Sequence, residues 1–172
     1  ASYHLVVIGA GTAGLVTAAG AAGRGARVAL VERHLMGGDC LNVGCVPSKA
    51  LIRSANFLKQ AREAATLGMT RAAVDYDFGE VMARVQRVIR TVEPHDSAAR
   101  YTGLGVEVIE GQARITSPWR VEVNGQTLTT RAIVIRTVRY ADQRTILKAY
   151  TEHAGMRSYV VRTGRRGTGT QA

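Results

Sequence analysis

The sequence predicts an α/β fold in which helices cover a parallel sheet and a small antiparallel β-meander follows. Three observations lead to this prediction. An apolar run at residues 4–8 leads directly into a glycine-rich turn and an alanine-rich segment, a second apolar run at residues 26–31 ends at an acidic residue, and short strand-like segments separated by turn signals fill residues 112–135. A strand, a turn, a helix and a second strand in this order are typical of a parallel βαβ unit.

The glycine-rich turn reads Gly9-Ala-Gly11-Thr-Ala-Gly14. Gly9 permits a tight turn, Gly11 lets the backbone approach a pyrophosphate, and Gly14 lets the helix pack closely on the sheet. Free amides at the helix start would then face phosphate. Glu32, 18 residues after Gly14, can accept hydrogen bonds from an adenosine ribose. The segment predicts a Rossmann-like site for FAD or NAD; a structural glycine turn with a solvated Glu32 is the alternative.

The chain has two cysteines, Cys40 and Cys45, in a stretch that Gly44 and Pro47 keep from forming a regular helix. In an ideal helix, residues five apart point roughly 140° away from each other, so a bond between the sulfurs requires local distortion. A thiol close to a helix N-terminus has a lowered pKa, and either cysteine could use this effect. We predict a redox pair. Inert buried thiols are the alternative, and no metal site is expected because the nearest histidine, His34, stands outside the motif.

Two further helices are expected between these cysteines and residue 94. The first runs from Ser48 to about Leu67. The second begins at Asp77 as N-cap, with Glu80 in its first turn, and ends near Pro94. Its apolar stripe is expected to lie against the sheet of the same domain, with a partner protein as the alternative, and its solvated side is expected to carry Arg84, Arg87 and Arg90.

The rest of the chain is predicted to be a strand at residues 105–110 and then the meander. Its turns are Ser117-Pro118 and Asn124-Gly125, the second of which is a two-residue hairpin signal, and its last strand is Ile133-Val-Ile135. No stretch of 18 apolar residues occurs, and no basic leader precedes the first strand. A soluble, cytoplasmic protein without membrane contact is expected.

The net charge of +10 is uneven along the 172 residues. Residues 136–172 carry eight basic and two acidic side chains, against 15 and 11 in residues 1–135. Hydrophobic periodicity fades in this last segment, and the end from Arg162 to Ala172 is of low complexity. We predict a domain at residues 1–135 and a basic, poorly ordered tail at residues 136–172.

The glycine turn together with Gly-Gly-Asp-Cys-Leu-Asn-Val-Gly-Cys-Val-Pro-Ser-Lys at residues 37–49 resembles the class I pyridine nucleotide-disulfide oxidoreductases. These include dihydrolipoamide dehydrogenase, glutathione reductase and mercuric reductase. The likeness covers residues 3 to about 135. Within the family, the Gly-Gly-Asp-Cys variant and Val-Pro-Ser-Lys-Ala-Leu at residues 46–51 are most similar to proteins described as mercuric reductase-like.

The resemblance implies an N-terminal FAD-binding domain in which Cys40 attacks the substrate and Cys45 lies beside the flavin ring. Lys49 would stabilise a reduced, anionic flavin. The other residues implied to bind the cofactor are Gly9, Gly11, Thr12, Ala13 and Gly14 at the pyrophosphate, Glu32 and Arg33 near the ribose, Gly38 and Asp39 before the cysteines, and Gly111 and Ala113 at the adenine. Electrons would pass from NAD(P)H through FAD to the disulfide and then to a small-molecule, disulfide or metal-ion substrate, in an enzyme that is a homodimer at full length.

The chain also departs from this family. Where members have Ile-Ala-Thr-Gly, this chain has Ile135-Arg-Thr-Val138, and the family's second glycine fingerprint, returning FAD segment and dimerisation domain do not follow. His153 lies in no catalytic context. We therefore expect residues 136–172 to be out-of-frame or otherwise non-homologous sequence on a truncated reductase, which reading the encoding DNA in its other frames would test.

Two other functions stay open at the level of sequence. The chain could be a non-catalytic dinucleotide-binding module with idle thiols, in which case Cys45→Ser would leave the flavin spectrum unchanged. It could also bind nucleic acid through its arginine-rich tail, since arginines with interspersed glycines can track phosphates. The absence of a groove-reading motif makes nucleic acid the less favoured partner.

Overall fold

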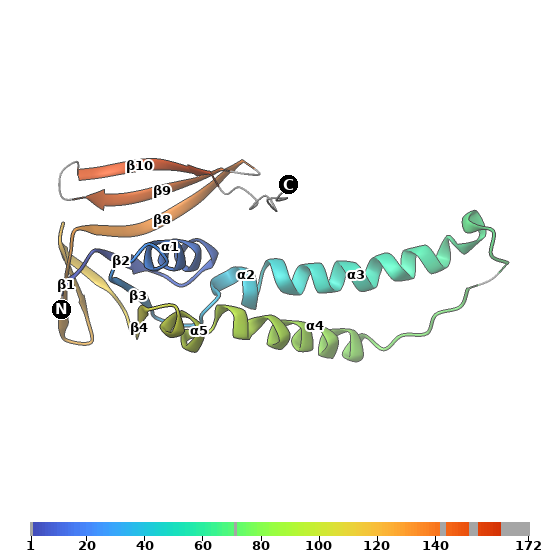
Figure 1. The fold of residues 1–172 in the computed structure, drawn as a ribbon. Coiled ribbons are helices and arrows are strands. Elements are labelled where there is room, and N and C mark those ends of the chain that lie inside the picture. The colour runs from blue at the N-terminus through green and yellow to red at the C-terminus, as the bar shows by residue number, and fades with distance from the viewer. Residues whose placement is uncertain (1, 71, 142–143, 152–154, 163–172) are drawn as a thin grey trace, which may run out of the picture.

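A computed structural model of the chain describes residues 2–70, 72–141, 144–151 and 155–162. Its main feature is a six-stranded sheet in the order β10-β9-β8-β2-β3-β4 (Figure 1). Strands β2, β3, β4 and β8 are parallel, whereas β9 and β10 are antiparallel. The bounds are β2 Leu5–Ile8, β3 Val28–Glu32, β4 Val106–Glu110, β8 Ala132–Ala141, β9 Arg144–Thr151 and β10 Gly155–Arg162.

Successive residues of the parallel strands serve two separate cores. Val6 and Ala29 pair across the sheet and lie in one cluster, while Val7 and Leu30, one residue on, lie in the other. This alternation follows from the two-residue repeat of a strand, and burial on both faces requires the near-continuous apolar runs seen in the sequence. Helix α1, Thr12–Ala22, covers the face on which Val7 and Leu30 lie, and its Leu15 belongs to the same cluster as these two residues. The predicted α/β class is confirmed.

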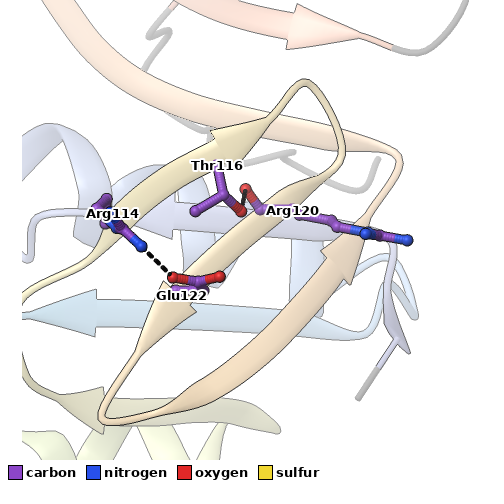
Figure 2. Close-up of polar contacts among 4 residues, drawn as sticks. All are labelled: Arg114, Thr116, Arg120 and Glu122. Carbon is purple, nitrogen blue, oxygen red and sulfur yellow. Dashed lines mark hydrogen bonds and ion pairs between the residues drawn. The ribbon is translucent and has the colours of Figure 1, made fainter.

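The second face is covered by a four-stranded sheet in the order β1-β7-β6-β5. Its strands are β1 Ser2–Tyr3, β5 Arg114–Ser117, β6 Arg120–Val123 and β7 Gln126–Thr130. Asn124 and Gly125 both have positive φ between the paired Val123 and Gln126, so the predicted two-residue hairpin is confirmed. On the exposed side, Arg114 and Glu122 face each other across β5 and β6 with a 2.7 Å ion pair (Figure 2).

Two helices project from the sheets as an arm in which α3, Cys45–Arg62, and α4, Phe78–Val92, run side by side (Figure 1). The remaining helical segments are α2 Gly38–Asn42, the 3₁₀ turns η1 Ala64–Leu67 and η2 Glu93–Asp96, and α5 Ala98–Gly103. The predicted N-cap of α4 is confirmed, because the Asp77 carboxylate accepts a 2.8 Å hydrogen bond from the amide of Gly79.

The expected burial of α4 against the sheet is wrong. Its apolar stripe lies along α3, because the two helices form a hairpin and α3 is the nearest apolar surface; Val85 is buried, but Phe78 at the start of the helix is 65% exposed. Arg84 is also not on the solvated side. It is half-buried and donates a 3.0 Å hydrogen bond to the carbonyl of Ala50 in α3. Arg87 and Arg90 are exposed as expected.

The last described strands differ from the sequence-based expectation. Residues 133–135 were expected to end the meander, but β8 lies in the large sheet, where Ile133 pairs with Val6. Strand β8 continues past residue 135, and β9 and β10 replace the expected poorly ordered chain; Ala149 of β9 is 3% exposed and packs in the cluster of α1. The open edge of β8 offers unpaired backbone groups, and the β-branched residues that follow favour a strand there. Residues 163–172 and His153 lie outside the described residues.

Candidate functional site

The glycine turn joins β2 to α1 through backbone contacts that exclude side chains. Gly9 has a φ of +100°, and its amide donates a 2.8 Å hydrogen bond to the carbonyl of Val31. A Cβ atom on Gly14 would lie 1.8 Å from the carbonyl oxygen of Gly9, so this helix can approach the strand only without a side chain there. A Cβ on Gly11 would meet nothing within 4 Å, which leaves open space in front of the turn.

Glu32 closes the end of β3 beside this turn. Its Oε2 accepts a 2.6 Å hydrogen bond from the amide of Ala10, and its Oε1 accepts one of 2.8 Å from the amide of His34. Glu32 is half-buried, and both of its carboxylate oxygens accept hydrogen bonds from the backbone. Because each carboxylate oxygen has a second lone pair, Glu32 keeps the capacity to accept a hydroxyl from a ligand.

The segment before the cysteines is docked on the glycine turn. The amide of Gly37 donates a 2.9 Å hydrogen bond to the carbonyl of Ala10, and Gly37 forms an isolated parallel bridge with Gly11. A Cβ on Gly38 would lie 2.8 Å from the Cα of Gly11. The two backbones therefore touch, and this contact carries Cys40 to the start of α1.

The two thiols lie beside each other but in different surroundings. Cys40 is half-buried in α2, whereas Cys45 is exposed in the first turn of α3, and both are free thiols. A hydrogen bond from the Cys45 thiol lowers the pKa of Cys40 against the opposing effect of burial, and Thr12, the Cys45 amide and the charge of Lys49 lower it further. The same interaction raises the pKa of Cys45. Cys40 is thus the first of the pair to become a thiolate, and an amide at the N-terminus of α3 helps to stabilise it.

A cavity of about 620 Å³ opens between the glycine turn, the end of β3 and the loop after β4. This volume lies within the range of roughly 300–1,000 Å³ that is typical of ligand sites. Of the residues predicted to bind a cofactor, those that line it are Gly9, Gly11, Glu32, Arg33, Gly38, Asp39, Gly111 and Ala113. Those that do not line it are Thr12, Ala13, Gly14 and Lys49, and the two cysteines also lie outside its wall.

Asn42 and His34 also line the cavity, although the sequence did not single out either as a site residue. A sequence feature that could have pointed to Asn42 is its position shortly after Gly37 and Gly38. Two glycines favour a left-handed turn, whose backbone carbonyls need hydrogen-bond donors such as a side-chain amide. Among the residues that the structure describes, no three or more His, Cys, Asp or Glu side chains are grouped so as to hold a metal ion. Within the same residues, no helix is long and apolar enough to cross a membrane.

The chain is similar to known proteins in sequence and in fold. The family model described as pyridine nucleotide-disulphide oxidoreductase matches residues 3–137. A dihydrolipoyl dehydrogenase of Acholeplasma laidlawii is 35% identical over 78% of this chain and 40% of its own length. A mercuric reductase of Lysinibacillus sphaericus is 29% identical over 79% of this chain and 25% of its own length. A glutathione reductase of Burkholderia cepacia is 35% identical over 78% of this chain and 30% of its own length.

A solved structure shows the same likeness. In the Cu(II) complex of the HOCl-induced flavoprotein disulfide reductase RclA from Escherichia coli, 28% of that chain aligns with 80% of this one at a TM-score of 0.61 and 26% identity. This chain therefore spans well under half of the length of these relatives. A second family model, described as Recombination protein O N terminal, matches residues 126–171.

Proposed function

The chain belongs to the pyridine nucleotide-disulphide oxidoreductase family, and from this premise we propose that residues 1–135 are the FAD-binding part of a disulfide oxidoreductase whose redox pair is Cys40 and Cys45. The observation that supports this most is the backbone contact between Gly38 and Gly11. It holds the thiol segment against the turn that would bind the dinucleotide, so that cofactor and thiols share one edge of the sheet.

The residues of the cavity fit an adenine dinucleotide. The open space before Gly11 and the free amides at the start of α1 suit a pyrophosphate, because backbone N–H groups and the helix dipole favour negative charge there. Glu32 would accept a ribose hydroxyl, with Arg33 beside it, and Gly111 and Ala113 would line the adenine. FAD, when bound, would pass an electron pair between a nicotinamide and the disulfide.

The two cysteines have different proposed roles in the thiol chemistry. Cys40 is the better thiolate of the reduced pair and is proposed as the nucleophile that attacks the substrate, since the thiolate is the reactive species in disulfide exchange. Cys45 keeps its proton and donates it in a hydrogen bond to Cys40. Lys49 contributes positive charge that favours the thiolate of both residues.

A visible spectrum of the purified protein, before and after dithionite, tests the proposal. A yellow protein whose flavin bands bleach on reduction is expected. Colourless protein that takes up no added FAD would refute the flavin site. In the yellow protein, Cys45→Ser should alter the spectrum and abolish dithiol exchange; an unchanged spectrum would favour the non-catalytic dinucleotide-binding module.

The finer features of the enzyme rest on the resemblance. We propose a small-molecule disulfide or a metal ion as substrate, NAD(P)H as electron donor and a reducing compartment such as the cytoplasm, where paired cysteines are more often catalytic than structural. A homodimer stays a prediction for the full-length protein. Turnover of NAD(P)H by residues 1–172 alone is not expected, because the chain covers at most 40% of the relatives described above.

A second function is favoured for the C-terminal segment. We propose that residues 136–172 are non-homologous to the reductases and contact nucleic acid, because the second family model begins at residue 126 and this segment has a net charge of +6. The second model overlaps the reductase model at residues 126–137 and continues past it to residue 171. Replacing both Arg165 and Arg166 by Gln should weaken binding of a single-stranded oligonucleotide and reduce its salt dependence. Equal affinity of variant and wild type would refute this function.

A further inference from the structure

The loop that carries Cys40 is closed by one side chain. The Nδ2 of Asn42 donates a 2.8 Å hydrogen bond to the carbonyl of Gly38 and a 3.1 Å hydrogen bond to the carbonyl of Met36. The two carbonyls stand on either side of Gly37, and Gly37 and Gly38 have φ values of +82° and +56°. Asn42 is half-buried and lines both the cavity of about 620 Å³ and a neighbouring one of about 270 Å³.

We propose that Asn42 is a positioning residue for the thiol pair: its amide fixes the loop of residues 36–42 so that Cys40 stays within reach of Cys45 and Thr12. This role rests on the proposed redox function of the two cysteines, and it adds a residue that acts on them through the backbone rather than by touching a substrate.

The chemistry of the side chain makes asparagine the residue that suits this loop. A primary amide has two N–H donors on one nitrogen, so a single short side chain can serve two carbonyls at once. Aspartate has the same shape but, when ionised, only accepts, and its charge would face two carbonyl oxygens. Serine has one donor and could replace only one of the two bonds.

The loop needs these two hydrogen bonds because glycine by itself does not hold one conformation. Gly37 and Gly38 can adopt positive φ without strain, but they also lose more conformational freedom on ordering than other residues do. Without the Asn42 amide, Gly37 and Gly38 gain alternative conformations, and Cys40 shifts relative to the groups that stabilise its thiolate. Those groups lie on two other elements, Thr12 on α1 and Cys45 with Lys49 on α3.

The pH dependence of alkylation at Cys40 tests the role of Asn42. Iodoacetamide labelling of the full chain, read by mass spectrometric fragmentation that separates positions 40 and 45, gives the midpoint of thiolate formation. Asn42→Ala and Asn42→Asp are expected to raise this midpoint, so that the labelling rate of Cys40 at pH 7 falls about threefold or more, which corresponds to roughly half a pKa unit. Asn56→Ala is the matched control, because Asn56 is exposed on α3.

Folded Asn42→Ala and Asn42→Asp variants with the wild-type midpoint would overturn the proposal, even if their melting temperature fell, because a merely structural role moves stability alone. If either variant is unfolded by circular dichroism, Asn42→Ser replaces it. The serine variant should show a smaller upward shift, and a wild-type midpoint there would also overturn the proposal.

The alkylation measurement needs no flavin, so the two proposals fail separately. A shifted Cys40 profile in a protein that binds no FAD would refute the flavin function and leave Asn42 as a positioning residue. A protein that binds FAD but shows no shift in any Asn42 variant would refute the role of Asn42 and leave the flavin function standing.

Discussion

The loop of residues 36–42 and the arm of α3 and α4 are consecutive in the chain but are held in opposite ways. The loop is fixed mainly by backbone contacts, since Gly37 is bridged to Gly11 and Gly38 lies directly against it, and the Asn42 side chain adds two hydrogen bonds within the loop. The arm is fixed by side chains that contact each other, and much of its surface is open, with Ile52 and Phe57 more than half exposed.

This difference explains why two cysteines five residues apart have different chemistry. Cys40 belongs to the fixed loop and collects hydrogen bonds from α1 and α3, whereas Cys45 begins the arm and is exposed. A site whose geometry rests on backbone contact tolerates little change, because a displaced backbone moves every atom attached to it. A helix pair held by side chains can absorb substitutions on its exposed face.

The largest effect is expected where the backbone contact is tightest. Gly14→Val places a Cβ 1.8 Å from the carbonyl of Gly9, and we expect it to lower the free energy of unfolding by about 3 kcal/mol. Urea unfolding measures this change. Gly20→Ala in the same helix is the control: its Cβ would meet only a flexible arginine tip at 3.9 Å, so the variant should be slightly more stable.

The docking of the loop is broken by Gly38→Ala. The added Cβ would lie 2.8 Å from the Cα of Gly11, and the positive φ adds strain. Together these should lower the free energy of unfolding by about 2 kcal/mol, which urea unfolding measures. The free energy of FAD binding should weaken by more than the free energy of unfolding falls, because the loop moves away from the cavity. Gly68→Ala, with a φ of +78° but open space, isolates the strain of the backbone. Equal losses of stability in the two variants would mean that the contact with Gly11 contributes nothing.

The contact between the two helices of the arm is tested by Arg84→Gln. Arg84 donates to the carbonyl of Ala50 near the start of α3, and its loss should cost about 1–2 kcal/mol because a hydrogen bond from a charged, half-buried group is removed. Arg87→Gln, at an exposed position of the same helix, should change the free energy of unfolding by less than about 0.5 kcal/mol. Thermal melts of both variants make the comparison.

The smallest effect is on proton binding at Cys40. Since the Cys45 thiol is the largest cause of its lowered pKa, Cys45→Ala should raise that pKa, and alkylation of Cys40 below pH 8 should slow by a few-fold. Lys49→Met should act in the same direction but less. The thiolate stabilises the folded state only above the ordinary thiol pKa, so this stabilisation is lost as the pH falls through the lowered value. A downward shift in either variant would contradict the assignment.

Much of the glycine turn could be predicted from local sequence. Gly9 and Gly14 occupy positions where only glycine fits the backbone, and Glu32 follows at the distance that one helix and one strand span. The hairpin at Asn124-Gly125 and the N-cap Asp77 were predictable for the same reason, because short-range geometry decides both. The site residues in front of the cysteines were predicted from a motif and not from geometry.

Other features depend on contacts between distant segments. Arg84 reads as a surface residue of an amphipathic helix, and only the packing of α4 on α3 turns it toward Ala50. Residues 133–135 read as the end of the meander, and only the parallel pairing with β2 puts them in the large sheet. The strands after residue 135 were missed because their periodicity is weak and β8 supplies the edge on which they form.

The sequence by itself determined the α/β class and the family, and it predicted the residues of the candidate site, because glycine conformations and strand periodicity are properties of a few neighbouring residues. Only the tertiary structure decided that Gly38 touches Gly11, that Asn42 closes the loop, and that Cys40 rather than Cys45 has the lowered pKa. Such contacts join residues far apart in the chain, and the thiol pKa values depend on the distances and burial that those contacts set.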